Sequence, residues 1–374
     1  ARGIIQNNDL DRYNFSVRNT TSMLNDKLTM DLSFMYSNVK EQNMLSQGEY
    51  ANPLVPVYLF PRGDDFSKYQ YYERYDVDRN IKTQFWPLKE NGLSMQNPYW
   101  ITNRNMYTNK KDRFLASGSL KYTITDWLNV SGRVKLDKET INSEKKMYAS
   151  TLNVIAENSD KGAYVQSNKN TSQIYADAML NINKYFYHDT WNLTASLGAS
   201  LLDLDYKELN FGGGLLTIPN LFTSNNANVS GKLTYKNTNY HDRTNSLFGT
   251  FSLGYKGMVY VDGSLRNDWI SALAGTNHSS ILYPSIGASA ILTNMFTMKS
   301  NILSYAKVRL SYSEVGNAPE RFRAITTYAV LGGLNTTSYF PIKDLKPERT
   351  HSWEGGFNLG LFDNKLTLDV TAYK

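Results

Sequence analysis

Hydrophobic and polar residues alternate along most of this chain with a period of two. In 128–138 the even positions up to 136 are apolar or glycine, and the odd positions are polar or charged. The even positions of 27–37 and 366–372 are also apolar, as are the odd positions of 191–201. Because successive side chains of a strand point to opposite faces, this alternation predicts strands with one apolar face.

Twelve segments of the chain show this pattern. Each has about ten or more residues, the length that a tilted strand needs to cross the hydrocarbon layer of a membrane. Strands of soluble proteins usually have about five or six residues. The predicted strands are 12–24, 27–37, 113–125, 128–138, 172–184, 191–203, 244–256, 258–269, 282–293, 304–314, 350–361 and 365–374.

Short and long connections alternate between these strands. The short ones are Asn25-Asp26, Asp126-Trp127, Tyr185–Thr190, Lys256-Gly257, Asn294–Leu303 and Asp363-Asn364. The other five are mostly long and cover 38–112, 139–171, 204–243, 270–281 and 315–349. Tight periplasmic turns and long extracellular loops give a membrane barrel this rhythm. We therefore expect an all-β fold, an antiparallel transmembrane β-barrel that crosses the cell outer membrane many times and contacts outer-membrane lipid.

A soluble β-sandwich or propeller would show the same alternation. Those folds use shorter strands and place long loops at both ends. The mean hydropathy of −0.47 does not exclude a membrane barrel, because its lumen-facing residues are polar. Charged residues such as Arg133, Lys135 and Asp177 lie opposite the apolar faces, as a wet interior requires. Aromatic residues near the strand ends match interfacial belts: Tyr36, Tyr122, Trp127, Tyr185, Phe186, Tyr187, Trp191, Tyr255, Tyr260 and Phe362.

The charge and the cysteine count exclude several classes of protein. The formal net charge is +6, but the basic residues are scattered and form no Lys/Arg-rich run. We therefore expect no nucleic-acid partner. The chain has no cysteine, which excludes a disulfide scaffold and thiolate metal sites.

No motif for catalysis or cofactor binding stands out. The four histidines lack the spacing of metal ligands, and Gly212-Gly213-Gly214 lacks the Lys-Ser/Thr of a phosphate loop. The segment that begins at Asp76 resembles a calcium loop, but Ile81 and Pro87 replace its essential Gly and Glu. We therefore expect no enzyme activity, no cofactor and no metal site.

The strand count and the two ends of the chain predict part of a larger barrel. Residues 2–10 resemble the last part of an extracellular loop that leads into the first strand, and Lys374 lies inside a predicted strand. An open sheet edge in lipid would leave unpaired backbone groups, each costing several kcal/mol. We expect neighbouring strands from chain outside this sequence.

The last third of the sequence carries four ordered motifs. They are VYVDGSLRND at Val259–Asp268, YPSIG at Tyr283–Gly287, KVRLSYSEVGN at Lys307–Asn317, and LKPERTHSWE at Leu345–Glu354 followed by Gly355-Gly356 and Asn364-Lys365-Leu366. In this order they resemble the SusC/RagA family of TonB-dependent transporters of Bacteroidetes. The resemblance covers about 244–374. Residues 1–243 match the family only in the alternation of short and long connections between strands and in the size of the loops.

The resemblance implies a barrel of about 22 strands with a plugged lumen, of which this chain would supply about twelve in one barrel domain, 1–374. The plug and the TonB-binding segment would lie outside this sequence. The resemblance also implies import of glycan or peptide pieces with a SusD-like surface lipoprotein as partner, and energy from the TonB complex. Two alternatives stay open: a structural or adhesion-type outer-membrane barrel, and a siderophore-type receptor.

The long connection 38–112 is the candidate ligand-contact segment. It is rich in aromatic residues and prolines, and a loop of this length is usually functional or disordered. We expect its rings and nearby carboxylates to contact substrate or partner, with these candidates: Tyr69, Tyr71, Tyr72, Trp86, Tyr99, Trp100, Asp64 and Asp65. The alternative is that the rings only pack the loop and contact the partner lipoprotein.

Overall fold

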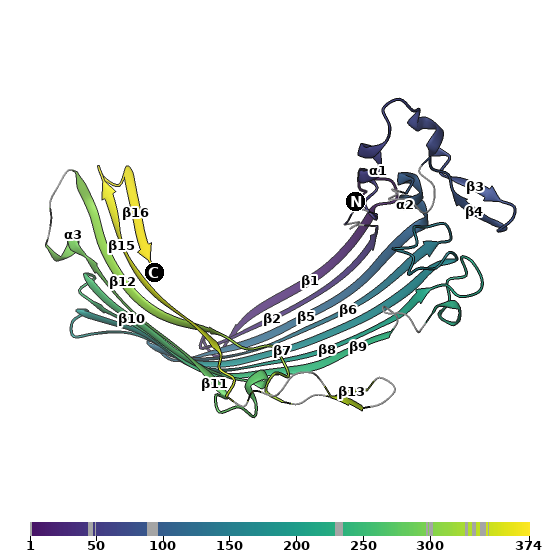
Figure 1. The fold of residues 1–374 in the computed structure, drawn as a ribbon. Helices are drawn as coiled ribbons and strands as arrows, with labels where there is room; N and C mark the ends of the chain where they lie inside the picture. Colours follow the sequence, from purple (N-terminus) through teal and green to yellow (C-terminus); the bar gives the residue numbers. More distant parts are fainter. Residues whose placement is uncertain are drawn as a thin grey trace.

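Twelve long strands form one antiparallel sheet in the computed structural model. Their order is β1-β2-β5-β6-β7-β8-β9-β10-β11-β12-β15-β16, so every long strand pairs with its neighbours in sequence. The sheet curves into a trough, with β1 and β16 at its two edges (Figure 1). The structure describes residues 2–374 except 44–47, 49, 88–95, 229–234, 297, 299–301, 326–327, 331–333, 337–341 and 343.

All twelve predicted strands are present. They are β1 (Asp9–Met23), β2 (Leu28–Gln42), β5 (Asn105–Thr125), β6 (Leu128–Tyr148), β7 (Gly162–Phe186), β8 (Trp191–Gly214), β9 (Tyr235–Tyr255), β10 (Val259–Ile270), β11 (Ser280–Ile291), β12 (Leu303–Asn317), β15 (Glu348–Leu361) and β16 (Leu366–Tyr373). The prediction of a partial antiparallel barrel wall is confirmed.

The strands in the middle of the sheet are longer than the sequence predicts. Strands β7 and β8 have 25 and 24 residues, about twice the length that crosses a membrane. The strands β6 and β7 pair without interruption from Leu128↔Ile182 to Tyr148↔Gly162. Much of what the sequence assigned to the connections 139–171 and 204–243 is therefore strand that rises beyond the apolar band.

The two faces of the sheet differ as the alternation predicts. Leu197 lies on the apolar face, and 58% of its surface is exposed. Ser246 and Asp177 lie on the other face and are buried, because a curved sheet crowds side chains on its concave side. The convex face is thus apolar and open, and the concave face is polar.

Two of the tight connections have a left-handed backbone at two successive short polar residues, each pair preceded by a bulky residue in the same conformation (Leu24 and Phe362). Asn25 and Asp26 follow β1 with φ of 52° and 63°, and Asp363 and Asn364 follow β15 with φ of 56° and 59°. Short polar side chains adopt this conformation at lower cost than branched ones. The sequence placed turns at these two dipeptides, and the structure confirms both.

The remaining elements are short and lie in the connections. Between β2 and β5 are α1 (Leu54–Leu59), η1 (Phe66–Gln70), β3 (Glu73–Asp76), β4 (Ile81–Gln84) and α2 (Pro98–Arg104). The others are η2 (Ser224–Asn226), η3 (Ser271–Leu273), α3 (Leu292–Met295), β13 (Tyr328–Val330) and β14 (Leu334–Thr336). Within the described residues, no helix has the length and apolarity needed to span a membrane.

Candidate functional site

The connection between β2 and β5 folds into a compact unit at the end of the sheet that carries the long loops (Figure 1). We call the described residues 50–87 and 96–104 the loop body. Its centre is aromatic. The ring of Tyr69 lies 5.5 Å from that of Phe60, 5.1 Å from Phe85 and 5.3 Å from Trp86, measured between centroids. Edge-to-face and tilted contacts at these distances stabilise an aromatic cluster beyond the area that it buries.

A second group of contacts fixes the loop body to the connection between β6 and β7. Trp100 is fully buried, and its Nε1 donates to Oγ1 of Thr151 at 3.0 Å. The backbone N–H of Leu152 donates to Oε1 of Gln96 at 3.0 Å, and Nε2 of Gln84 donates to the carbonyl of Ser150 at 2.6 Å. Buried polar side chains are stable only when paired in this way. Two connections far apart in sequence therefore form one body.

Helix α2 joins the loop body to β5. Asn97 caps this helix by accepting from the N–H of Tyr99 at 2.8 Å, and Pro98 follows at the first helical position. The amide of Asn97 also donates to the carbonyls of Tyr69 and Phe85 at 2.8 and 2.9 Å. One buried asparagine thus positions both the helix and the aromatic cluster.

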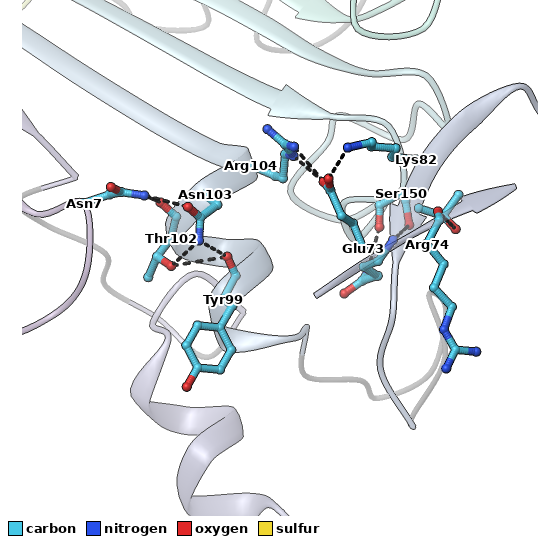
Figure 2. Close-up of polar contacts among 11 residues, drawn as sticks. Asn7, Glu73, Arg74, Lys82, Tyr99, Thr102, Asn103, Arg104 and Ser150 are labelled. Atoms are coloured by element: carbon cyan, nitrogen blue, oxygen red, sulfur yellow. Dashed lines mark hydrogen bonds and ion pairs between the residues drawn. The ribbon is translucent and has the colours of Figure 1, made fainter. Parts of the chain in front are cut away.

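A charged cluster holds the edge of the loop body. Figure 2 shows the carboxylate of Glu73 between Arg104 and Lys82. Nη2 of Arg104 and Nζ of Lys82 lie 2.6 and 2.5 Å from its two oxygens. Burial raises the pKa of Glu73, but the hydrogen bonds from Lys82 and Arg104 outweigh it, so the pKa lies below the ordinary carboxyl value.

This shift predicts an acid-sensitive loop body. A carboxylate with a depressed folded-state pKa stabilises the fold above its unfolded value of 4.5, and the stabilisation is lost as pH falls through the folded value. We expect Glu73→Gln to lower the local stability by about 1–3 kcal/mol at neutral pH. Hydrogen exchange of the loop body between pH 7 and pH 3 measures this. If the wild type and the variant lose protection equally on acidification, Glu73 is not the group responsible.

The structure separates the eight predicted contact residues into two sets. Tyr69, Trp86 and Trp100 are buried, so their rings pack the loop body rather than present a surface. The hydroxyl of Tyr69 donates to Asp64 at 3.0 Å, and Asp65 accepts from the N–H of Ser67 at the start of η1.

Asp64 and Asp65 are exposed, and the remaining three predicted residues have accessible side chains too. Tyr71 is 83% exposed, whereas Tyr72 and Tyr99 are half-buried. The ring of Tyr72 lies 5.8 Å from Cζ of Arg104. Contact with a ligand or a partner stays a prediction, and Tyr71 is the residue best placed for it.

Ion pairs line the concave face of the sheet. Most join neighbouring strands, as with Nη2 of Arg133 on β6, which lies 2.7 Å from Asp177 on β7. Further pairs on this face are Arg113–Asp137, Lys111–Glu139, Arg266–Asp268 and Arg309–Asp369. Charged groups in this arrangement keep the face hydrated and suit a wall along which polar molecules move.

Sequence reasoning missed a group of residues above the apolar band. Tyr206 and Tyr240 lie directly opposite each other on β8 and β9, within the range 204–243 that the alternation predicts to be a long connection. The alternation fades there because both faces of a strand outside the membrane meet water. No sequence signal could therefore locate this pair.

These features agree with comparisons to known proteins. Residues 54–374 match the family model described as TonB dependent receptor-like, beta-barrel. The chain therefore belongs to this family, and it is an outer-membrane β-barrel protein. The end of the sheet with long connections is thus extracellular, and the end with tight turns is periplasmic. No match was found among curated proteins.

Solved structures share the fold at low sequence identity. The chain resembles the RagAB peptide transporter with a TM-score of 0.73 and 18% identity, over 98% of this chain and 40% of that one. It resembles the ferric preacinetobactin receptor BauA of Acinetobacter baumannii with a TM-score of 0.53 and 11% identity, over 100% and 48%. For the ferric citrate transporter FecA the TM-score is 0.54 and the identity 10%, over 98% and 43%. The chain spans less than half the length of these proteins.

Proposed function

We propose that this chain is part of the barrel of a TonB-dependent transporter that imports oligosaccharides or oligopeptides across the outer membrane. The observation that carries the proposal is the match of 54–374 to the receptor barrel family. The polar, ion-paired concave face supports it, because such a wall suits passage of hydrophilic cargo. In this proposal 1–374 is part of one barrel domain, and the plug and the TonB-binding segment belong to chain outside it.

The edges of the sheet support the proposal of a larger barrel. Strand β1 pairs only with β2, and β16 only with β15, within the part of the chain that the structure describes. Both strands present apolar residues to the convex side, for example Val17 and Leu368. Unpaired backbone groups in lipid cost several kcal/mol each, so further strands of the same transporter would pair with both edges.

The loop body supports an extracellular partner. Helix α1 leaves Leu54, Tyr58 and Leu59 exposed, and Tyr71 is exposed beyond η1. In the proposed function a SusD-like lipoprotein covers this end of the barrel, and these side chains meet it or the incoming glycan or peptide. Energy comes from the TonB complex on the periplasmic side.

Purification from detergent-solubilised outer membranes tests the proposal. We expect intact-mass spectrometry to show a parent chain about two and a half times as long as this one, with a surface lipoprotein bound, given the 40% coverage of the RagAB transporter. Labelled oligosaccharides or oligopeptides should enter cells only while the TonB complex is energised. A lone chain of 42.6 kDa without a lipoprotein would favour a structural or adhesion-type barrel. Uptake of a ferric complex instead would indicate a siderophore-type receptor.

A further inference from the structure

A pair of stacked tyrosines lies on the concave face where β8 and β9 rise above the membrane. The rings of Tyr206 and Tyr240 are 4.7 Å apart between centroids and inclined by 14°. They are direct partners in the register of the two strands, so the sheet itself holds them in this stack. The hydroxyl of Tyr206 donates to Glu208 at 2.8 Å, which fixes the first ring.

A guanidinium group from a distant loop fills the space beside this pair. Cζ of Arg321 lies 3.8 Å from the ring centroid of Tyr240. Its Nε and Nη2 lie 2.6 and 2.5 Å from the same carboxylate oxygen of Asp242. Arg321 follows the end of β12 at Asn317 and reaches β9 above the last residue pair between β9 and β10, Thr244↔Ile270.

The two halves of this contact lie in different kinds of structure. Tyr206, Tyr240 and Asp242 belong to paired strands, whereas Arg321 belongs to a connection whose next residue, Phe322, has a φ of 63°. The side chains of Arg321 and Asp242 are 41% and 27% exposed. Ion pairs this exposed add little to stability, so another guanidinium or ammonium group could replace that of Arg321 with little loss.

We propose that Tyr206, Tyr240 and Asp242 form a subsite for a basic side chain of a peptide ligand, and that Arg321 is its internal competitor. An aromatic face beside a carboxylate is the arrangement that recognises a guanidinium or ammonium group. The proposal rests on the import function proposed above, because a subsite on the concave face meets what enters the barrel. It narrows the cargo to peptides that carry Arg or Lys.

Titration calorimetry on the purified full-length transporter tests the subsite. The probes are arginine amide and citrulline amide, which have the same shape and differ in the charge of the side-chain end. Arg321→Ala should bind arginine amide up to about fivefold more tightly than the wild type, since the weakly held competitor is gone. Citrulline amide should bind both proteins alike. Adding Asp242→Asn to Arg321→Ala should remove the gain.

The matched control is Arg323→Ala, which removes an arginine from the same loop. Nη2 of Arg323 lies 2.5 Å from a carboxylate oxygen of Glu320, three residues before it in the same loop. This variant should leave the affinity for arginine amide unchanged. Equal affinities for the wild type and Arg321→Ala would overturn the proposal, and so would an equal gain for citrulline amide. Arg321→Gln provides the same comparison if the alanine variant does not fold.

Failure of the subsite and failure of the import function give different results. If arginine amide binds as expected but no labelled oligomer enters energised cells, the subsite stands and the import function falls. If oligopeptides enter but Arg321→Ala gains no affinity for arginine amide, the import function stands and the subsite is wrong.

Discussion

Trp100→Ala is expected to unfold the loop body while the barrel wall stays intact. The ring of Trp100 is fully buried, and its Nε1 is bonded to Thr151 in another connection. Removal of a buried tryptophan side chain costs about 3–5 kcal/mol, because a cavity remains and packing is lost. The loop body is small, so a loss of this size should abolish its local stability. Hydrogen exchange and limited proteolysis of 50–104 in the full-length protein would measure the effect.

The matched control for this variant is Tyr71→Ala in the same loop body. Tyr71 is 83% exposed, so its truncation leaves no cavity and should change protection very little. Trp100→Phe keeps most of the ring but loses the hydrogen bond to Thr151, and it should fall between the two. If Trp100→Ala leaves proteolysis of the loop body unchanged, the contacts between Trp100 and the β6–β7 connection do not hold this unit together.

Uptake should respond to both variants, although only one of them is expected to disturb the fold. If exposed rings contact cargo or the lipoprotein, Tyr71→Ala should weaken uptake without weakening the fold. Trp100→Ala should weaken both, since it displaces the whole surface. The two variants therefore separate a contact residue from a packing residue.

The alternation of apolar and polar residues predicted the wall of the barrel because lipid and lumen impose opposite demands on the two faces. Strand β6 shows where that signal ends. Its even positions are apolar up to Leu136, but Thr140, Asn142 and Glu144 continue the same face above the membrane. Water on both sides removes the difference between the faces. The strand therefore continues to Tyr148 without a pattern that sequence analysis could recognise.

The loop body shows a different limit. Burial of Tyr69, Trp86 and Trp100 fits the alternative that the rings pack the loop, since so many rings are costly to leave in water. Which rings are buried depends on partners that are distant in sequence, such as Thr151 and Leu152 against Trp100 and Gln96. Local sequence says nothing about these contacts. The candidates Trp100 and Tyr71 therefore look alike in sequence and differ completely in exposure.

Leu197→Arg is expected to destabilise the barrel in a bilayer. Leu197 lies near the middle of the membrane-crossing part of β8, on the convex face, with 58% of its surface exposed. An arginine at the bilayer midplane on the lipid face of a barrel costs about 2–4 kcal/mol. Folding of the full-length protein into lipid vesicles, followed across a urea series, would measure this as a shift of the midpoint to lower urea.

Thr194→Arg on the concave face of the same strand is the matched control. Thr194 pairs with Asn183 and Ser252, so the new guanidinium would meet uncharged polar neighbours and water. Its cost should be small, because the lumen already holds ion pairs such as Arg133–Asp177. Equal destabilisation by both variants would mean that the two faces of β8 meet the same environment. The assignment of the convex face to lipid would then be wrong, and so would the inference that cargo and basic side chains reach Tyr240 from the concave side.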